Sequence, residues 1–259
     1  MFITSDEAQL LAVSFGSGSR TLLAFGGWVG NWELWAEPFT ILSQTWRTVA
    51  YDHRGAGATI CPLESITMTN MVNDVFAVMN ALAIDQCVLA AESAGVAVAL
   101  QAVLQHPERF TGLVIVDGAY YRLPQAGPSP FVQALRANHE ATMKQFVNTC
   151  VPEPDNEAIK HWGRQIVMRS PQAAAIQLYE IMDGVDLRPQ VHLVAVPTLI
   201  CHGEADALVP LPDAQWLADQ IPGSHLHVLP GAGHVPTMTR PHEIAAIINQ
   251  FFDPTSIAH

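Results

Sequence analysis

Residues 86–100 of this chain read Gln86-Cys87-Val88-Leu89-Ala90-Ala91-Glu92-Ser93-Ala94-Gly95-Val96-Ala97-Val98-Ala99-Leu100. A short apolar run of strand length leads to a serine, and the apolar residues after it recur with a helical period, so the pattern predicts a strand, a sharp turn and a helix. Ala91 and Gly95 are small because larger side chains would collide where the helix passes close to neighbouring strands. Ser93 is therefore expected at the turn, with its hydroxyl exposed. Taken alone, the stretch would also fit a tight connection with an ordinary serine.

Two further polar side chains are expected just past the ends of later strands. The strand at 197–202 leads into Gly203-Glu204-Ala205-Asp206, and the strand at 224–229 leads into the loop that ends at His234. A serine hydroxyl is a weak nucleophile near neutral pH and needs an adjacent base, and an acid must hold that imidazole in the right tautomer. Ser93, Asp206 and His234 are therefore predicted as nucleophile, acid and base. Asp117, after the strand at 111–116, is a rival for the acid, and Glu204 is a weaker one.

A glycine-rich loop follows the strand at 21–25 and reads Gly26-Gly27-Trp28-Val29-Gly30. A plain flexible turn would explain these glycines equally well. However, the loop lies one strand–helix unit ahead of Ser93, and backbone N–H groups at such a place can hold the negative charge that develops on a carbonyl under attack. We therefore predict the amides of Trp28 and Ala94 as the two donors, the second at the positive end of its helix.

Four motifs resemble those of the α/β-hydrolase superfamily. They are the nucleophile elbow, written A-x-S-x-G at 91–95, the D-x-R-G-x-G turn at 52–57, the G-x-x-D-x-x-V-P run at 203–210 and the G-A-G-H loop at 231–234. The order of nucleophile, acid and histidine is also that of the family. The resemblance covers the whole chain and implies an α/β fold, with a mostly parallel twisted sheet and helices on both faces. It also implies a catalytic triad of Ser93, Asp206 and His234 and an oxyanion hole formed by the backbone of Trp28 and Ala94.

The glycine-rich loop departs from the family pattern, which is usually His-Gly-x. Gly26 takes the place of the histidine, Gly27 matches the glycine and Trp28 matches x. The backbone donor is kept, but a side chain that often props the loop is lost, so the rigidity of the loop is in question.

The D-x-R-G-x-G turn is expected to be structural. Asp52 and Arg54 would brace it, while Gly55 and Gly57 would adopt dihedral angles that other residues resist. His53 lies near the same edge of the sheet, and we expect no chemical role for it.

The strand–helix alternation stops between residues 119 and 195. Helical patterns run over 131–148, 157–168 and 171–182, without an intervening strand. In α/β-hydrolases such an insertion is a cap that forms the substrate pocket. We therefore predict a core domain made of residues 1–118 and 196–259, and a helical cap at 119–195 inserted after the sixth strand.

The composition limits the partners. The formal net charge is −12, and Lys144 and Lys160 are the only lysines, so nucleic acid and anionic membranes are poor partners. The most apolar region, 88–104, is interrupted by Glu92, Ser93 and Gln101, which argues against a membrane span. The expected partner is a small-molecule substrate, and a homo-oligomer is compatible with the sequence.

The N-terminal residues and the cysteines indicate the cellular compartment, and the histidines indicate whether a metal cofactor is expected. The first residues lack the basic and apolar regions of a secretory signal. The four cysteines, Cys61, Cys87, Cys150 and Cys201, have no C-x-x-C spacing, so we expect reduced thiols in the cytoplasm. His225 and His227 alternate on one strand face without a recognisable third ligand, so neither a metal nor another cofactor is expected.

The leading hypothesis is a carboxylic ester hydrolase that cleaves an ester or lactone of a small, largely apolar substrate through an acyl-enzyme on Ser93. The resemblance extends to enol-lactonases, to C–C bond hydrolases and to cofactor-free perhydrolases, which share this machinery. The C–C hydrolases need a basic group for a substrate carboxylate, and the candidates are Arg122, Arg136, Arg164 and Arg169. A ligand receptor of the same fold is a further alternative. Haloalkane dehalogenases and epoxide hydrolases are disfavoured because they need an aspartate where this chain has Ser93.

Overall fold

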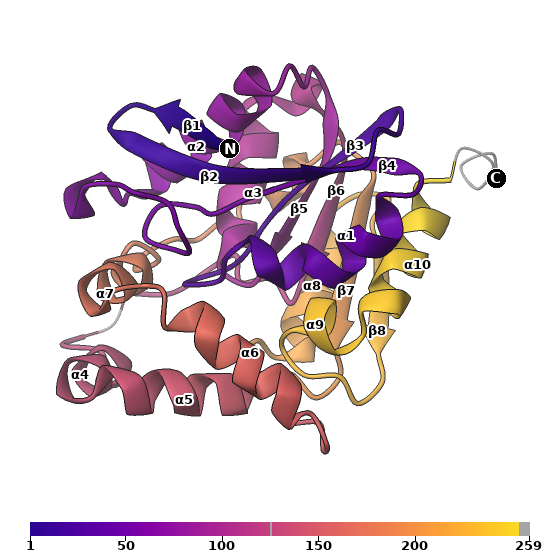
Figure 1. Ribbon diagram of the computed structural model, residues 1–259. Helices are drawn as coiled ribbons and strands as arrows, with labels where there is room; N and C mark the ends of the chain where they lie inside the picture. Colours follow the sequence, from indigo (N-terminus) through magenta and orange to yellow (C-terminus); the bar gives the residue numbers. More distant parts are fainter. Residues whose placement is uncertain (125, 254–259) are drawn as a thin grey trace.

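The computed structural model describes residues 1–124 and 126–253 (Figure 1). Within these residues eight strands form one sheet, in the order β1-β2-β4-β3-β5-β6-β7-β8. The strands are β1 (Phe2–Ser5), β2 (Ala8–Phe15), β3 (Arg20–Phe25), β4 (Trp46–Tyr51), β5 (Cys87–Glu92), β6 (Phe110–Val116), β7 (Thr198–Gly203) and β8 (His225–Leu229). β2 runs antiparallel to β1 and β4, and the other neighbouring pairs are parallel, which confirms the predicted mostly parallel sheet.

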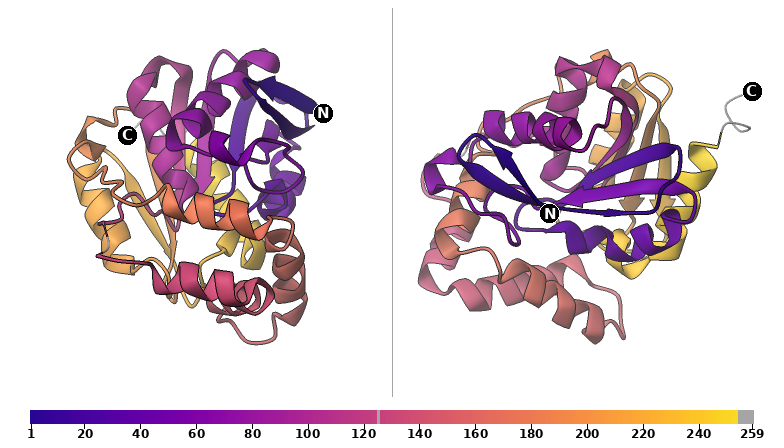
Figure 2. Two further views of the ribbon diagram at one scale, coloured as in Figure 1. Left: turned by 90° about the vertical axis from the view of Figure 1, so that its left-hand side faces the viewer. Right: turned by 45° about the horizontal axis from the view of Figure 1, so that its top comes forward.

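Helices cover both faces of the sheet, as Figure 2 shows. Successive residues of a strand face opposite sides. Leu23 of β3 and Leu89 of β5 therefore belong to one buried cluster, together with residues of α2 (Met68–Ala81), α3 (Gly95–Gln105) and α8 (Leu211–Gln220). Leu22 and Val88 belong to a second cluster with residues of α1 (Ala36–Leu42) and α10 (Pro241–Phe251). The sheet is thus packed between two apolar cores, one on each face.

Four helices gather beside one end of the sheet (Figures 1 and 2). They are α4 (Pro130–Ala137), α5 (His139–Cys150), α6 (Glu157–Val167) and α7 (Gln172–Glu180). The prediction of one helix over 131–148 is wrong. Asn138 adopts an extended conformation with φ −157°, and its side chain accepts a hydrogen bond from the amide of Ala141, so it ends α4 and caps α5.

The shorter helical segments are η1 (Trp32–Trp35), η2 (Leu63–Ser65), η3 (Pro107–Arg109), η4 (Val191–Leu193) and α9 (Pro236–Thr239). β1 was not predicted from the sequence; it pairs with β2 and buries Ile3 and Ser5. None of the helices in residues 1–124 and 126–253 has the length and apolar character needed to cross a bilayer.

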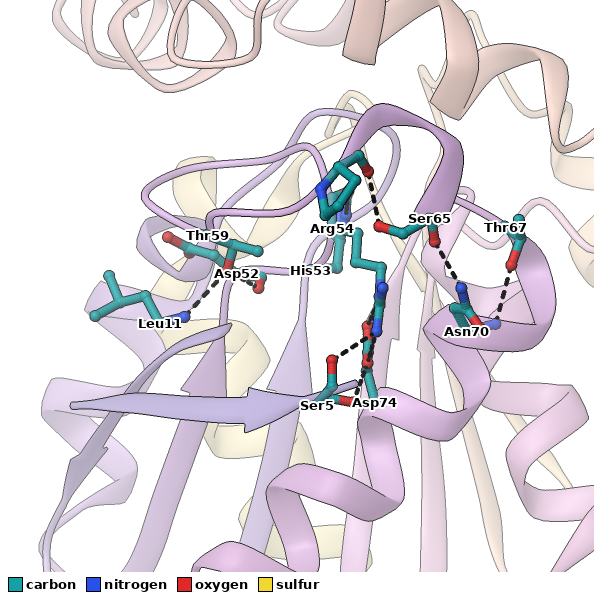
Figure 3. Close-up of polar contacts among 11 residues, drawn as sticks. Ser5, Leu11, Asp52, His53, Arg54, Thr59, Ser65, Thr67, Asn70 and Asp74 are labelled. Atoms are coloured by element: carbon teal, nitrogen blue, oxygen red, sulfur yellow. Dashed lines mark hydrogen bonds and ion pairs between the residues drawn. The ribbon is translucent and has the colours of Figure 1, made fainter. Parts of the chain in front are cut away.

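The turn after β4 is held from two sides (Figure 3). The Asp52 carboxylate accepts hydrogen bonds from the amides of Trp32 and Ala58, both at 2.8 Å. Arg54 reaches away from Asp52: its Nε and Nη2 donate to the Asp74 carboxylate of α2 at 2.7 and 2.9 Å, and both side chains are fully buried. The two side chains therefore brace the turn as expected, although by separate routes.

Candidate active site

Ser93 stands in a strained turn between β5 and α3. Its φ is 52°, in the left-handed region that costs a non-glycine residue about 1–3 kcal/mol. The conformation is held by hydrogen bonds from the Ser93 amide to the Val116 carbonyl at 2.9 Å and from the Ala119 amide to the Ser93 carbonyl at 3.0 Å. A Cβ atom on Gly95 would lie 2.6 Å from the Gly26 carbonyl oxygen, which explains why the helix begins with glycine.

The structure brings Ser93, His234 and Asp206 together. His234 Nε2 lies 2.8 Å from Ser93 Oγ, and His234 Nδ1 lies 2.7 Å from Asp206 Oδ2. Burial alone would raise the pKa of Asp206, but the hydrogen bonds from His234 and from the amides of Leu208 and Val209 outweigh it, so the pKa is lowered. Asp206 is therefore ionised at neutral pH and can hold a proton on Nδ1, which leaves Nε2 free to take the proton of the serine hydroxyl.

The two rival acids are hydrogen-bonded to other groups than His234. Asp117 Oδ1 accepts a hydrogen bond from the Gly203 amide at 2.8 Å, and burial together with the nearby Asp206 raises the pKa of Asp117 well above its ordinary value. Glu204 Oε2 accepts from the Gly231 amide at 3.0 Å. Neither carboxyl group is hydrogen-bonded to His234 within the described part of the chain.

Asp117, Asp206 and His234 bring three ligand-type atoms within 4.8 Å of one another. Such a group could hold a metal ion, but the Asp206–His234 hydrogen bond already uses two of the three side chains. That hydrogen bond accounts for the proximity of Asp206 and His234.

The glycine-rich loop lies against the elbow. A Cβ atom on Gly27 would lie 2.6 Å from Ser93 Cβ and 3.1 Å from the Ala94 amide nitrogen, so only glycine fits there. Among the described residues, no backbone carbonyl accepts from the Trp28 or Ala94 amide. Both amides are therefore available to an oxyanion bound at Ser93.

His53 props this loop in place of the missing histidine. It is buried, and its Nε2 lies 3.2 Å from the Gly27 carbonyl oxygen while its Nδ1 lies 3.0 Å from the Arg54 carbonyl oxygen. The indole N–H of Trp28 adds a hydrogen bond to the Ala175 carbonyl of α7 at 2.8 Å. The loop is thus tied to the turn after β4 and to α7.

Two cavities meet at Ser93. The larger has a volume of about 470 Å³, and the smaller of about 50 Å³. Ser93, His234, Trp28 and Phe146 line both of them. A substrate carbonyl placed at Ser93 would therefore have one substituent on each side.

The four arginines proposed to bind a substrate carboxylate all have partners. Of these, Arg122 lines the larger cavity, and neither cavity is lined by the other three. The partners are Asp183 for Arg122, Glu180 for Arg136, Asn148 and Glu157 for Arg164, and Glu33 for Arg169.

Two buried carboxyl groups outside the predicted triad lie next to its residues, and sequence reasoning missed the first of them, Glu153. Glu153, between α5 and α6, accepts a hydrogen bond from the Gly233 amide at 2.9 Å, next to His234. Glu92, next to Ser93, is buried and accepts from the Thr237 hydroxyl at 2.8 Å, and burial raises the pKa of Glu92 to about 8. No local sequence signal identifies Glu153, because its partner lies far along the chain, whereas a carboxyl residue beside the nucleophile was visible in the sequence.

Comparison with known proteins agrees with this fold. A 3-oxoadipate enol-lactonase from Acinetobacter baylyi is 23% identical, in an alignment of 268 positions that covers 96% of each chain. A pimeloyl-(acyl-carrier protein) methyl ester esterase from Edwardsiella ictaluri is 28% identical, in an alignment that covers 93% of this chain and 96% of the esterase. The solved structure of an esterase from Exiguobacterium antarcticum superposes with a TM-score of 0.89 at 22% identity, covering 95% of this chain and 97% of that one.

A family model described as serine aminopeptidase, S33, matches residues 38–238, which is more than half of the chain. The predicted α/β-hydrolase fold is confirmed by the solved structures that match nearly the full length. The chain therefore belongs to the serine aminopeptidase S33 family of α/β-hydrolase enzymes.

Proposed function

We propose that this enzyme cleaves an ester or lactone of a small, largely apolar substrate through an acyl-enzyme on Ser93. The observation that supports this most is the chain of contacts from Ser93 Oγ to His234 Nε2 at 2.8 Å and from His234 Nδ1 to Asp206 Oδ2 at 2.7 Å. The relatives named enol-lactonase and methyl ester esterase also point to carboxylic esters.

In the proposed mechanism, Ser93 Oγ attacks the substrate carbonyl and its proton passes to His234 Nε2. The amides of Trp28 and Ala94 donate to the oxyanion of the tetrahedral intermediate. His234 then gives the proton to the leaving alkoxide, and the carbonyl forms again as the acyl-enzyme. Water, deprotonated by His234, attacks the acyl-enzyme and releases the acid.

The charge of the larger cavity favours an ester over the C–C hydrolase alternative. Arg122 is the one cationic residue in its lining, and an ion pair with Asp183 at 3.0 Å already uses it. A carboxylate-bearing substrate would find no unpaired cation there.

The insertion that contains α4 to α7 supplies much of the lining of both cavities, and we propose that residues 119–195 act as the cap.

We also propose that the protein works in a reducing cytoplasm, which the four cysteines support because they are free thiols.

The test is hydrolysis of p-nitrophenyl acetate and p-nitrophenyl butyrate by the wild-type enzyme and by Ser93→Ala. We expect turnover by the wild type and a loss of about 10³-fold or more in the variant, with an unchanged circular dichroism spectrum. A folded Ser93→Ala variant that retained the wild-type rate would exclude the proposed nucleophile.

A further inference from the structure

We propose that the larger cavity beside Ser93 is a subsite for a positively charged aromatic group, so that the enzyme prefers short-chain esters of cationic aromatic compounds. This inference rests on the proposed function, because it assumes that the ester carbonyl lies at Ser93, and it narrows the alcohol part of that substrate to an aromatic group with one positive charge.

The cavity has an aromatic wall. Six of the residues that line it are aromatic: Trp28, Tyr120, Tyr121, Phe131, Phe146 and Tyr179. Three of them are packed edge to face, with centroids 4.8 Å apart for Trp28 and Phe146 and 5.1 Å apart for Trp28 and Phe131. Such a wall accepts a flat ring, and the negative faces of aromatic rings attract a cation.

The charges around this cavity leave one carboxylate unpaired. The charged residues in its lining are Arg122 and Asp213. Arg122 forms an ion pair with Asp183 at 3.0 Å, donates to the Tyr179 carbonyl at 2.8 Å and lies 3.5 Å from the centre of the Tyr179 ring. Its charge is therefore balanced before a substrate binds.

A second cation, Arg188, lies over the ring of Tyr121 at 4.3 Å. It too has its own carboxylate, Asp186, at 2.7 Å. Each of the two cations is thus matched by one anion, and Asp213 is the charge that remains.

Asp213 is held but not neutralised. Its Oδ2 accepts a hydrogen bond from the Tyr121 hydroxyl at 3.1 Å, and within the described residues no arginine, lysine or histidine forms an ion pair with it. Burial, together with the Asp213 carboxylate, raises the pKa of Tyr121, so this hydroxyl remains a donor. The carboxylate attracts a cation in the cavity and repels an anion, in the same direction as the net charge of −12 on the whole chain.

The smaller cavity limits the other side of the ester. Its volume is about 50 Å³, and Leu34, Val147, Ile166 and Met238 are among its apolar lining residues. That volume is about a tenth of the volume of the larger cavity, so the smaller cavity suits the smaller substituent of the ester, a short acyl group. The two cavities together favour a short-chain ester of a cationic phenol.

The test uses three phenyl acetates that differ in one substituent at the para position. The substituents are 2-(trimethylammonio)ethyl, its neutral isostere 3,3-dimethylbutyl, and 2-carboxyethyl. We expect kcat/KM for the cationic ester to exceed that for the neutral ester by about tenfold, and the anionic ester to be about tenfold worse than the neutral one. Equal values, or a preference for the neutral or anionic ester, would overturn the inference.

Asp213→Asn should reduce the ratio of cationic to neutral kcat/KM to near one. The matched control is Asp219→Asn, at an exposed position of the same helix, which should keep the wild-type ratio. A preserved ratio in a folded Asp213→Asn variant would also overturn the inference.

The outcomes separate this inference from the proposed function. Ser93-dependent turnover of all three esters without discrimination overturns the subsite alone, as does labelling of Ser93 by a fluorophosphonate without turnover of any of them. Absence of both labelling and turnover overturns the subsite and the proposed function together.

Discussion

Glu153 is expected to hold the loop that carries His234, and replacing it by alanine should slow ester hydrolysis. Two hydrogen bonds and one close approach join this loop to the last residue of α5 and to the segment after it. The His234 amide donates to the Cys150 carbonyl at 2.8 Å, the Gly233 amide donates to Glu153 Oε1 at 2.9 Å, and a Cβ on Gly233 would lie 2.3 Å from Pro152 Cδ. The imidazole is therefore positioned from the candidate cap as well as from its own strand.

The size of the expected loss of activity follows from the loss of the carboxylate that accepts the Gly233 hydrogen bond. Glu153 is only 5% exposed, so Glu153→Ala leaves the buried Gly233 amide without its partner, at a cost of about 1–3 kcal/mol. A relaxed loop would also shift His234, and a misplacement of about 1 Å can cost about 10²-fold in rate. We expect kcat to fall about 10- to 100-fold with little change in KM. Glu153→Gln keeps the acceptor, and Oε2 has no hydrogen-bond partner to lose, so its kcat should stay within about fivefold of wild type.

The assay is hydrolysis of p-nitrophenyl acetate, combined with thermal unfolding and with the rate at which a fluorophosphonate labels Ser93. A slower labelling rate would report weaker activation of the nucleophile, which a loss of stability alone would not produce in a folded sample. Glu157→Ala is the control, since the Glu157 side chain is 73% exposed and pairs with Lys160 on the surface of α6. A folded Glu153→Ala variant with wild-type kcat and labelling rate would refute the reasoning.

Two further predictions concern the carboxyl groups of Asp206, Asp117 and Glu92, which lie near His234 or Ser93. Asp206→Asn should lower kcat by about 10³- to 10⁴-fold, because the amide no longer fixes the tautomer of His234. The kcat of Asp117→Asn should stay within about tenfold of wild type. Steady-state kinetics that gave the reverse order would make Asp117 the acid. Burial raises the pKa of Glu92 from 4.5 to about 8, so between these pH values the folded chain keeps a proton that the unfolded chain releases. The contribution of Glu92 to stability is therefore full below pH 4.5 and is lost as the pH rises toward 8. The free energy of unfolding should therefore fall by up to about 1.4 kcal/mol per pH unit through this interval, and Glu92→Gln should remove that dependence. Denaturation by urea across the pH range tests this, and a stability difference between variant and wild type that does not change with pH would contradict it.

The site was predictable where its residues carry a local signal. Ser93 sits between small residues at the change from strand period to helix period, and the elbow has that form. Asp206 and His234 each follow a short apolar run, and parallel strands place such positions at one edge of the sheet. These patterns are local because strain, close backbone approach and strand length are properties of short segments.

The sequence could not reveal groups whose role depends on distant partners. His53 and Glu153 act on the loops of Gly27 and His234 through contacts between segments far apart in the chain. The break at Asn138 was missed because the apolar repeat continues across it, so a local cap was hidden by a longer periodicity. β1 was missed because it is a short edge strand, with only Ile3 and Ser5 buried.

The most direct measurement is the site of covalent modification by a fluorophosphonate, mapped by peptide mass spectrometry on the wild-type enzyme, Ser93→Ala and His234→Ala. We expect one adduct on Ser93 in the wild type, none in Ser93→Ala, and labelling at least about 10²-fold slower in His234→Ala because the hydroxyl has lost its base. Labelling on another serine, or labelling of Ser93 at the wild-type rate without His234, would contradict the proposal that these two residues carry the reaction.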